Sequence, residues 1–183
     1  MKQGNRTKYT VLGMLSINSM SGYEIVKNIK NSTNHFWSES EGQIYPALTL
    51  CVNEGFASCK EEASIKGAQR MKKVYTITRN GKKELQTWLK KEPQNTLVRN
   101  ELLLKLFFGD NMNQDDNIHH ITHKQKDCEA EIANYEKMRQ AILLKDKHIA
   151  HHNFWLITLD YGFKTAKAEL AWCKDALKIL RSE

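Results

Sequence analysis

The chain has 183 residues, of which 40% are apolar and 27% charged, and such values are ordinary for a globular protein of one or two small domains. Two prolines and nine glycines argue against disorder and favour helix. Because no apolar run approaches the length of a membrane span and the N-terminus lacks a signal-peptide core, we expect a cytoplasmic protein with no membrane partner.

The net charge of +7 is unevenly distributed along the chain. Residues 1–95 contain 15 Lys and Arg against 8 Asp and Glu, whereas residues 96–183 contain 13 of each. All of the excess positive charge therefore belongs to the first half, and this asymmetry indicates a polyanionic partner for that half. The alternative is a basic surface that serves only solubility.

Three helices are predicted in the first part of the chain. Apolar periodicity indicates one from Lys8 to Ile17, and a capping box of Ser21 and Glu24 opens the second. The third covers residues 38–55, with capping-box signals at its start and Gly55 placed to end it. Its apolar face consists of Ile44, Leu48, Cys51 and Val52. The opposite face is polar and nearly free of charge, which suits insertion into a groove, and carries Gln43, Pro46, Thr49, Leu50 and Asn53.

Two predicted strands follow this helix. One lies within residues 56–62, and the other, KVYTI at 73–77, is rich in β-branched residues and alternates between the two faces of a strand. A basic loop joins them, and Thr78 then caps a fourth helix that runs to about residue 91. Three helices, a two-stranded wing and a fourth helix predict a winged helix-turn-helix domain over residues 1–93.

The second half, residues 94–183, is predicted to be helical, so the fold class is mainly α. Helices are expected at 98–108, 114–147 and 153–180, and the last two carry apolar residues at near-heptad spacing. We expect an antiparallel coiled-coil domain that also forms a dimer, because two helices alone cannot cover both seams and the side stripe of Trp172 and Ile179. The predicted dimerisation residues are Trp155, Leu159, Phe163, Leu170, Cys173 and Leu177.

A winged helix gives the positive charge a role in DNA binding. The helix at 38–55 would enter the major groove, where Gln43 and Thr49 can read base edges or phosphates and Leu50 can contact a thymine methyl group. The wing, residues 63–73, would lie along the phosphates. Its basic residues are Lys66, Arg70, Lys72 and Lys73. A solvated charged loop is the alternative for the wing.

Other chemistry has weaker support in the sequence. The aromatic residues near the last helix suggest a pocket for a flat effector, although helical spacing favours a dimer core. Two histidine groups, at 119–123 and 148–152, have workable metal spacing but would lie at opposite ends of a helical hairpin, so surface imidazoles are expected. The four cysteines lack metal spacing and are expected to be buried free thiols, with a redox switch as the alternative. We expect no enzyme, metal or cofactor, since no catalytic motif is present.

Several short motifs together resemble one known family. The motifs are SGYEI at 21–25, GQIYPAL at 42–48, NEGF at 53–56, KKVYTITRNGKKEL at 72–85, VRNELLLKLFFGD at 98–110 and the ending LDYG…AELAWCKDAL. In this combination the chain is similar to the PadR family of bacterial winged-helix transcriptional regulators. The second half is similar to the longer subfamily with a virulence-activator-like C-terminal helical domain.

The resemblance implies a homodimer that binds a near-palindromic operator, usually as a repressor and sometimes as an activator. Founding members of the family respond to phenolic acids and others to drugs or unknown signals, so a small aromatic effector is a hypothesis and its identity does not transfer. The resemblance maps Tyr23, Gln43, Tyr45 and Pro46 onto the DNA-facing surface, and Arg70, Lys72 and Lys73 onto the wing. The helix at 38–55 lacks a Lys or Arg, so affinity for phosphate is expected to come from the wing and from Lys8, Lys27 and Lys30. The two copies of this surface in a dimer would add to that affinity. Alternatives are an activator without an effector, a protein-interaction module, and a metal- or thiol-dependent enzyme.

Overall fold

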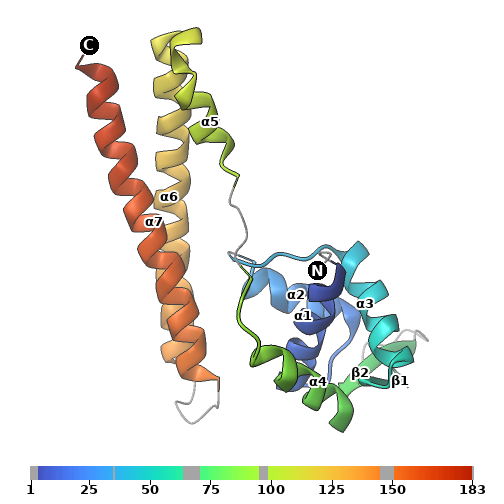
Figure 1. Ribbon diagram of the computed structural model, residues 1–183. Helices are drawn as coiled ribbons and strands as arrows, with labels where there is room; N and C mark the ends of the chain where they lie inside the picture. Colours follow the sequence, from blue (N-terminus) through green and yellow to red (C-terminus); the bar gives the residue numbers. More distant parts are fainter. Residues whose placement is uncertain (1–3, 35, 64–70, 95–98, 145–150, 183) are drawn as a thin grey trace. The chain divides into compact units, whose positions relative to one another are not determined.

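The computed structural model describes residues 4–34, 36–63, 71–94, 99–144 and 151–182 (Figure 1). The chain divides at residue 95 into two compact units. None of the described helices combines the length and the apolar content that crossing a membrane requires.

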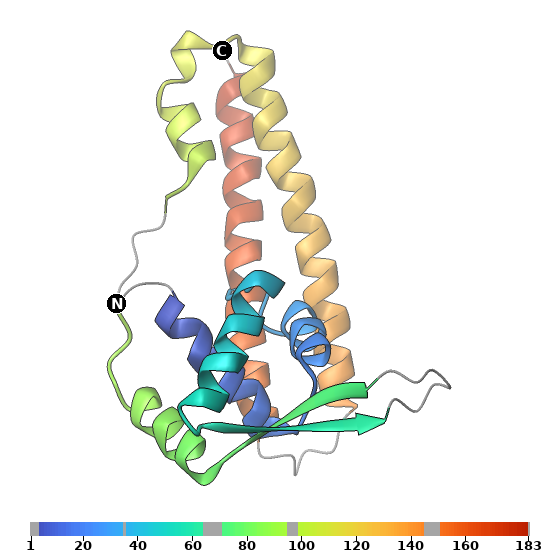
Figure 2. The same ribbon diagram turned by 90° about the vertical axis from the view of Figure 1, so that its right-hand side faces the viewer.

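The first unit is a winged helix, as predicted. Three helices are followed by an antiparallel hairpin and a fourth helix, and Figure 2 shows the two strands side by side. The hairpin register runs from Ala57 opposite Ile77 to Ala63 opposite Met71. The elements are α1 (Gly4–Ile17), α2 (Gly22–Asn31), α3 (Glu41–Asn53), β1 (Ala57–Ala63), β2 (Met71–Ile77) and α4 (Arg79–Leu89).

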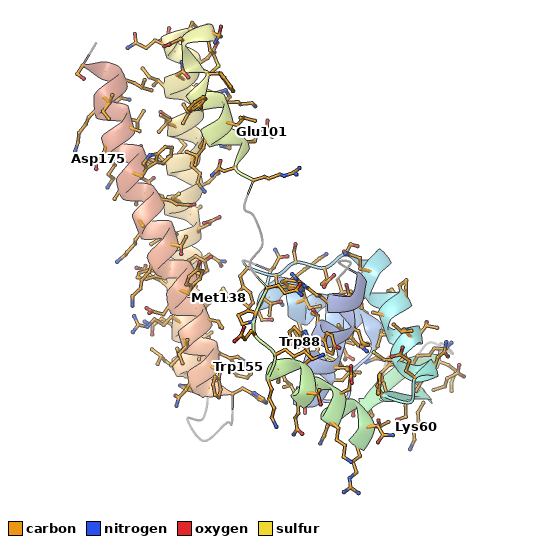
Figure 3. The ribbon with its side chains drawn as sticks, viewed as in Figure 1. Lys60, Trp88, Glu101, Met138, Trp155 and Asp175 are labelled. Atoms are coloured by element: carbon orange, nitrogen blue, oxygen red, sulfur yellow. The ribbon has the colours of Figure 1, made fainter. Side chains whose placement is uncertain are left out.

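One hydrophobic core joins the helices of this unit. Its fully buried side chains come from α1, α2 and α3, and include Leu12, Ile25, Ile29, Ile44 and Leu48. The fourth helix adds Leu85 and Trp88, which is labelled in Figure 3. The Trp88 ring stacks on Tyr9 of α1, with ring centroids 4.6 Å apart. Because α3 contributes one whole face to this core, its orientation is set by packing rather than by the wing.

The two ends of α3 follow the predicted local signals. Ser40 is the N-cap residue, and its backbone N–H donates to Gln43 Oε1 at 2.9 Å. At the C-terminal end Gly55 has φ +72°, and the N–H of Phe56 donates to the Cys51 carbonyl at 2.8 Å. This left-handed glycine turns the chain directly into β1.

Strand β2 is also tied to the turn between α1 and α2. The Met20 N–H donates to the Tyr75 carbonyl at 3.1 Å, and the Tyr75 N–H donates back at 3.0 Å. Beside this bridge the hydroxyl groups of Ser19 and Thr76 lie 2.7 Å apart. The wing is therefore anchored at its base next to the N-terminus of α2.

The second unit is built on a helical hairpin. The short α5 (Glu101–Phe107) and a 3₁₀ turn (Gly109–Asn111) lead into α6 (Gln114–Leu143), which lies beside α7 (His152–Arg181) (Figure 1). Two buried clusters hold α6 to α7, one around Ile121 and the other around Tyr135. At Gly162 a Cβ would lie 2.8 Å from Tyr135, so the glycine lets the two helices approach closely there.

The hairpin gives part of the α7 seam an intramolecular role. Leu159, Cys173 and Leu177 are buried within the hairpin, and Trp155, Phe163 and Leu170 are half-buried. Leu159, Phe163, Cys173 and Leu177 thus belong to an intramolecular seam, because two facing heptad patterns in one chain cover each other. Another apolar stripe on α7 stays exposed, and it consists of Phe154, Ile157, Tyr161, Trp172 and Ile179.

Candidate nucleic-acid interface

The face of α3 that points away from the core is polar and uncharged, as predicted. Pro46 and Thr49 are exposed, and Tyr45 and Leu50 retain 47% and 41% of their accessible surface. The other face of the helix is buried, with Ile44, Ala47, Leu48 and Cys51 in the core. A helix held by one face presents the other as a rigid surface.

The N-terminus of α2 adjoins this exposed face. A Cβ at Gly22 would lie 2.6 Å from Tyr45 Cε1, so the glycine is needed for the close approach of the Tyr45 ring. The next residue, Tyr23, is 67% exposed. The two tyrosines assigned to DNA contact therefore come from two helices that meet at this point.

Gln43 has a structural role that limits what it can offer to DNA. Its Oε1 accepts from both the backbone N–H and the hydroxyl of Ser40, each at 2.9 Å, and the residue is half-buried. The group that can reach a base edge is therefore its amide nitrogen, which is a donor. Thr49 is exposed, although its hydroxyl donates to the Tyr45 carbonyl at 3.2 Å.

The two described wing lysines differ in their surroundings. Lys73 is exposed and pairs in register with Glu61 on β1. Lys72 is half-buried, and its Nζ donates to Glu24 Oε1 at 2.8 Å. Lys66 and Arg70, the other two predicted wing contacts, lie outside the described residues. Nothing in the sequence indicated that Glu24 lies beside the wing, because it is 48 positions from Lys72.

Glu24 connects the wing to the α2 cap. Its Oε2 accepts from the backbone N–H and the hydroxyl of Ser21, both at 2.8 Å. The hydrogen bond from Lys72, followed by that from the Ser21 backbone, lowers the pKa of the Glu24 carboxyl to about 2. The carboxylate is therefore charged at neutral pH and holds two elements together.

We predict that this carboxylate makes the first unit sensitive to acid. Because its pKa is lowered on folding, the charged carboxylate stabilises the folded state fully at pH values above 4.5, the ordinary pKa of Glu. This stabilisation is lost as the pH falls through about 2. Because the side chain is 42% exposed, solvent screening limits the effect to about 1 kcal/mol. Urea unfolding followed by hydrogen exchange in α2 should show this loss between pH 4.5 and pH 2. The Glu24→Gln variant should lack it, and an equal loss in that variant would contradict the assignment.

Lys8 is not available to DNA, which corrects the expectation for this residue. Its side chain is 11% exposed and its Nζ lies 3.1 Å from Glu84 and 3.5 Å from Glu54. The ammonium also lies 4.9 Å from the centroid of the Phe56 ring. Burial is the largest single influence and acts to lower the pKa of Lys8, but the hydrogen bond with Glu84 and the nearby charges of Tyr9, Glu84 and Glu54 together leave the pKa raised. The residue is a buried cation linking α1, α3 and α4, whereas Lys27 and Lys30 are exposed.

Within the described parts of the chain no three His, Cys, Asp or Glu side chains gather as metal ligands. His148, which belongs to the second histidine group, lies outside them. All four cysteines are free, and three of the four are buried, whereas Cys59 on β1 is exposed. Burial raises the pKa of Cys51 and Cys128 to about 11. Such thiols are poor nucleophiles at neutral pH.

Comparison with known proteins covers both halves of the chain. Residues 11–87 match the Transcriptional regulator PadR-like family, and residues 98–181 match Virulence activator alpha C-term. The Negative transcriptional regulator PadR of Bacillus subtilis (strain 168) is 39% identical over 102 residues, which is 55% of each chain. The chain thus aligns with about half the length of this curated relative.

Solved structures extend the likeness to the whole fold. The Bacillus subtilis PadR structure in complex with operator DNA has a TM-score of 0.81 and 28% identity, covering 94% of this chain and 98% of that one. The structure of the same protein in complex with p-coumaric acid, at 24% identity and a TM-score of 0.77, covers 100% and 99% and shows the shared fold. With both halves matched, the chain belongs to the PadR-like family of transcriptional regulators, not to a class of enzymes, and has a virulence-activator-like C-terminal half.

Proposed function

We propose that this chain is a homodimeric repressor that binds a near-palindromic DNA operator. Helix α3 would enter the major groove, with Tyr45, Pro46 and Thr49 toward the bases, and the wing would follow the phosphates. The observation that carries the proposal is the exposed, uncharged face of α3 beside Tyr23 and next to the anchored basic wing. The Bacillus subtilis relative, a negative regulator that has been solved with operator DNA, supports the same reading.

The proposed dimer rests on the apolar surface of the second unit. On α7 the exposed stripe of Phe154, Ile157, Tyr161, Trp172 and Ile179 lies on the side of the helix away from the seam. Helix α5 adds Leu103, Leu104, Phe107 and Phe108, each at least half exposed. Monomeric proteins rarely expose so many large apolar side chains in one small helical unit, and a second copy of the chain would cover them. Such a dimer would present two α3 helices about 34 Å apart, which is one turn of DNA.

We predict that binding to the promoter beside its own gene depends steeply on salt. With six or more phosphate contacts, affinity should fall by about 10³-fold or more between 50 and 200 mM salt. Lys73→Ala should reduce the slope of log affinity against log salt concentration by about one, and it should weaken binding to all DNA sequences equally. Thr49→Ala should instead lose about 1 kcal/mol of binding free energy for the operator and leave binding to random DNA unchanged. Fluorescence anisotropy with operator and random duplexes measures both effects.

A matched control is Lys137→Ala, which removes the same charge from an exposed position on α6. It should leave both affinity and salt dependence unchanged. If the wild-type protein binds the promoter no more tightly than random DNA and with a shallow salt dependence, the protein-interaction alternative is favoured instead.

The effector is a separate part of the proposal. We propose a small aromatic acid, and p-coumaric acid is the probe because Bacillus subtilis PadR has been solved with it. The aromatic side chains of α7 that would lie at the dimer interface supply a fitting environment for a flat ligand. Titration of the probe into the protein–operator complex should release DNA. If operator affinity is unchanged at saturating p-coumaric acid, this compound is not the effector, and the DNA-binding proposal is unaffected.

A further inference from the structure

A carboxylate lies within the surface proposed to bind DNA, next to Tyr23. Glu24 is the third residue of α2, and both of its oxygens are engaged. Oε2 accepts from Ser21 in the capping box, and Oε1 accepts from Lys72 of the wing at 2.8 Å. An acidic group in this place is unexpected, because it would lie close to the DNA backbone, which carries one negative charge per 1.7 Å of duplex.

Both partners of this ion pair are held in place by the backbone around them. The Met20–Tyr75 bridge fixes β2 beside the N-terminus of α2, three residues from Lys72. The capping box fixes the Glu24 carboxyl from the other side. With both backbones held, little conformational entropy opposes the contact. Lys72 nevertheless keeps 41% of its side-chain surface, so its ammonium remains within reach of a phosphate.

We propose that Glu24 competes with the DNA backbone for Lys72 and thereby limits how much of the wing's positive charge acts on phosphate. This inference rests on the proposed DNA-binding function. In the free protein the carboxylate neutralises the lysine, and on binding Lys72 has to exchange Glu24 for a phosphate oxygen. The carboxylate then remains near the polyanion without its partner. Both the exchange and the remaining repulsion reduce affinity, whatever the base sequence.

The test uses Glu24→Gln in the full-length protein. Glutamine still accepts the Ser21 hydrogen bonds, because Gln serves at this position of a capping box as Glu does, so the start of α2 is preserved. Without the negative charge Lys72 is released for phosphate. Affinity for operator and for random duplex at 50 mM salt should rise by about fivefold. The slope of log affinity against log salt should become steeper by about 0.9.

A double-mutant cycle assigns this gain to Lys72. In the Lys72→Gln background the Glu24→Gln substitution should no longer steepen the salt dependence, because no lysine remains to be released. Lys72→Gln alone should cost less affinity than Lys73→Ala, since Lys72 gives up an ion pair when it binds phosphate. The control Glu136→Gln makes the same charge change on an exposed position of α6 and should leave binding unchanged.

The outcomes separate this inference from the proposed function. If the wild-type protein binds DNA but Glu24→Gln binds with equal or lower affinity, Glu24 does not compete for Lys72 and the inference is overturned. A gain in affinity that is undiminished in the Lys72→Gln background also overturns it, because the gain would then come from general charge repulsion and not from the release of Lys72. If the wild-type protein shows no salt-dependent DNA binding, the proposed function itself fails, and the competition with it.

Discussion

Replacing Gly81 by alanine is expected to unfold most of the first unit. Gly81 lies in the first turn of α4, and a Cβ there would lie 2.0 Å from the Phe56 carbonyl oxygen and 2.9 Å from Ile77 Cγ1. The Phe56 carbonyl cannot move freely, because it accepts the Thr78 N–H at 2.9 Å. Thr78 in turn caps α4 by accepting from the Gly81 N–H.

The expected cost of this substitution is more than about 3 kcal/mol, since the clash is with backbone rather than with a flexible side chain. Alanine would favour the helix by only about 1 kcal/mol, so the clash dominates. Hydrogen exchange of amides in α1 and α3 across a urea series measures the stability of this unit alone. Operator binding should be lost in parallel, because the same junction positions β2 and the wing.

The control for Gly81 is another helical glycine in the same unit. At Gly13 in α1 a Cβ would meet nothing within 4 Å, so Gly13→Ala should stabilise the unit by about 1 kcal/mol. The two glycine-to-alanine changes are therefore expected to have opposite signs. Normal exchange protection in Gly81→Ala would mean that the Phe56 turn can move aside, which would contradict the account of this junction.

The second large effect is expected from a charge in the exposed stripe of α7. Ile157 is 64% exposed in the single chain, so Ile157→Asp should leave the hairpin folded. In the proposed dimer the aspartate would lose its water without gaining a partner, and that cost opposes association. Analytical ultracentrifugation should show monomer. Operator affinity should fall by about 100-fold or more, because the second half-site no longer binds intramolecularly.

The control for the dimer is Ala130→Asp. This residue is exposed on the polar side of α6, opposite the seam, and the substitution adds the same charge to the same unit. It should stay dimeric and retain operator affinity. If Ile157→Asp also remains a dimer, the stripe is not the interface, and α5, with Phe107 at 80% exposure, becomes the surface to test.

Helix α3 and its surroundings could be predicted from the sequence because their signals are local. The Ser40–Gln43 capping box and the turn at Gly55 involve residues at most a few positions apart, and the structure confirms both. The strand alternation before Thr78 and the basic loop identified a wing for the same reason. Some predicted helix ends differ by two or more residues from those in the structure, because helix ends fray and alternative capping signals compete there.

The environment of individual charges could not be predicted in this way. Lys8 and Glu84 are 76 positions apart, and Lys72 and Glu24 are 48 apart. Nothing in the spacing of such residues indicates that they meet, so the sequence did not distinguish among the six lysines considered for phosphate contact. Packing of α1 against α3 and α4 buries Lys8, whereas pairing of β2 with the α1–α2 turn brings Lys72 to Glu24.

The sequence by itself determined the family, the winged-helix order of elements and the groove-facing helix, because helix periodicity, capping and turn chemistry act between near neighbours. Only the tertiary structure decided which charges are available and which α7 face is free. The seam of Leu159, Cys173 and Leu177 is covered by α6 of the same chain, and the stripe with Ile157 is not. Both faces have the same apolar periodicity, so their difference arises from long-range packing alone.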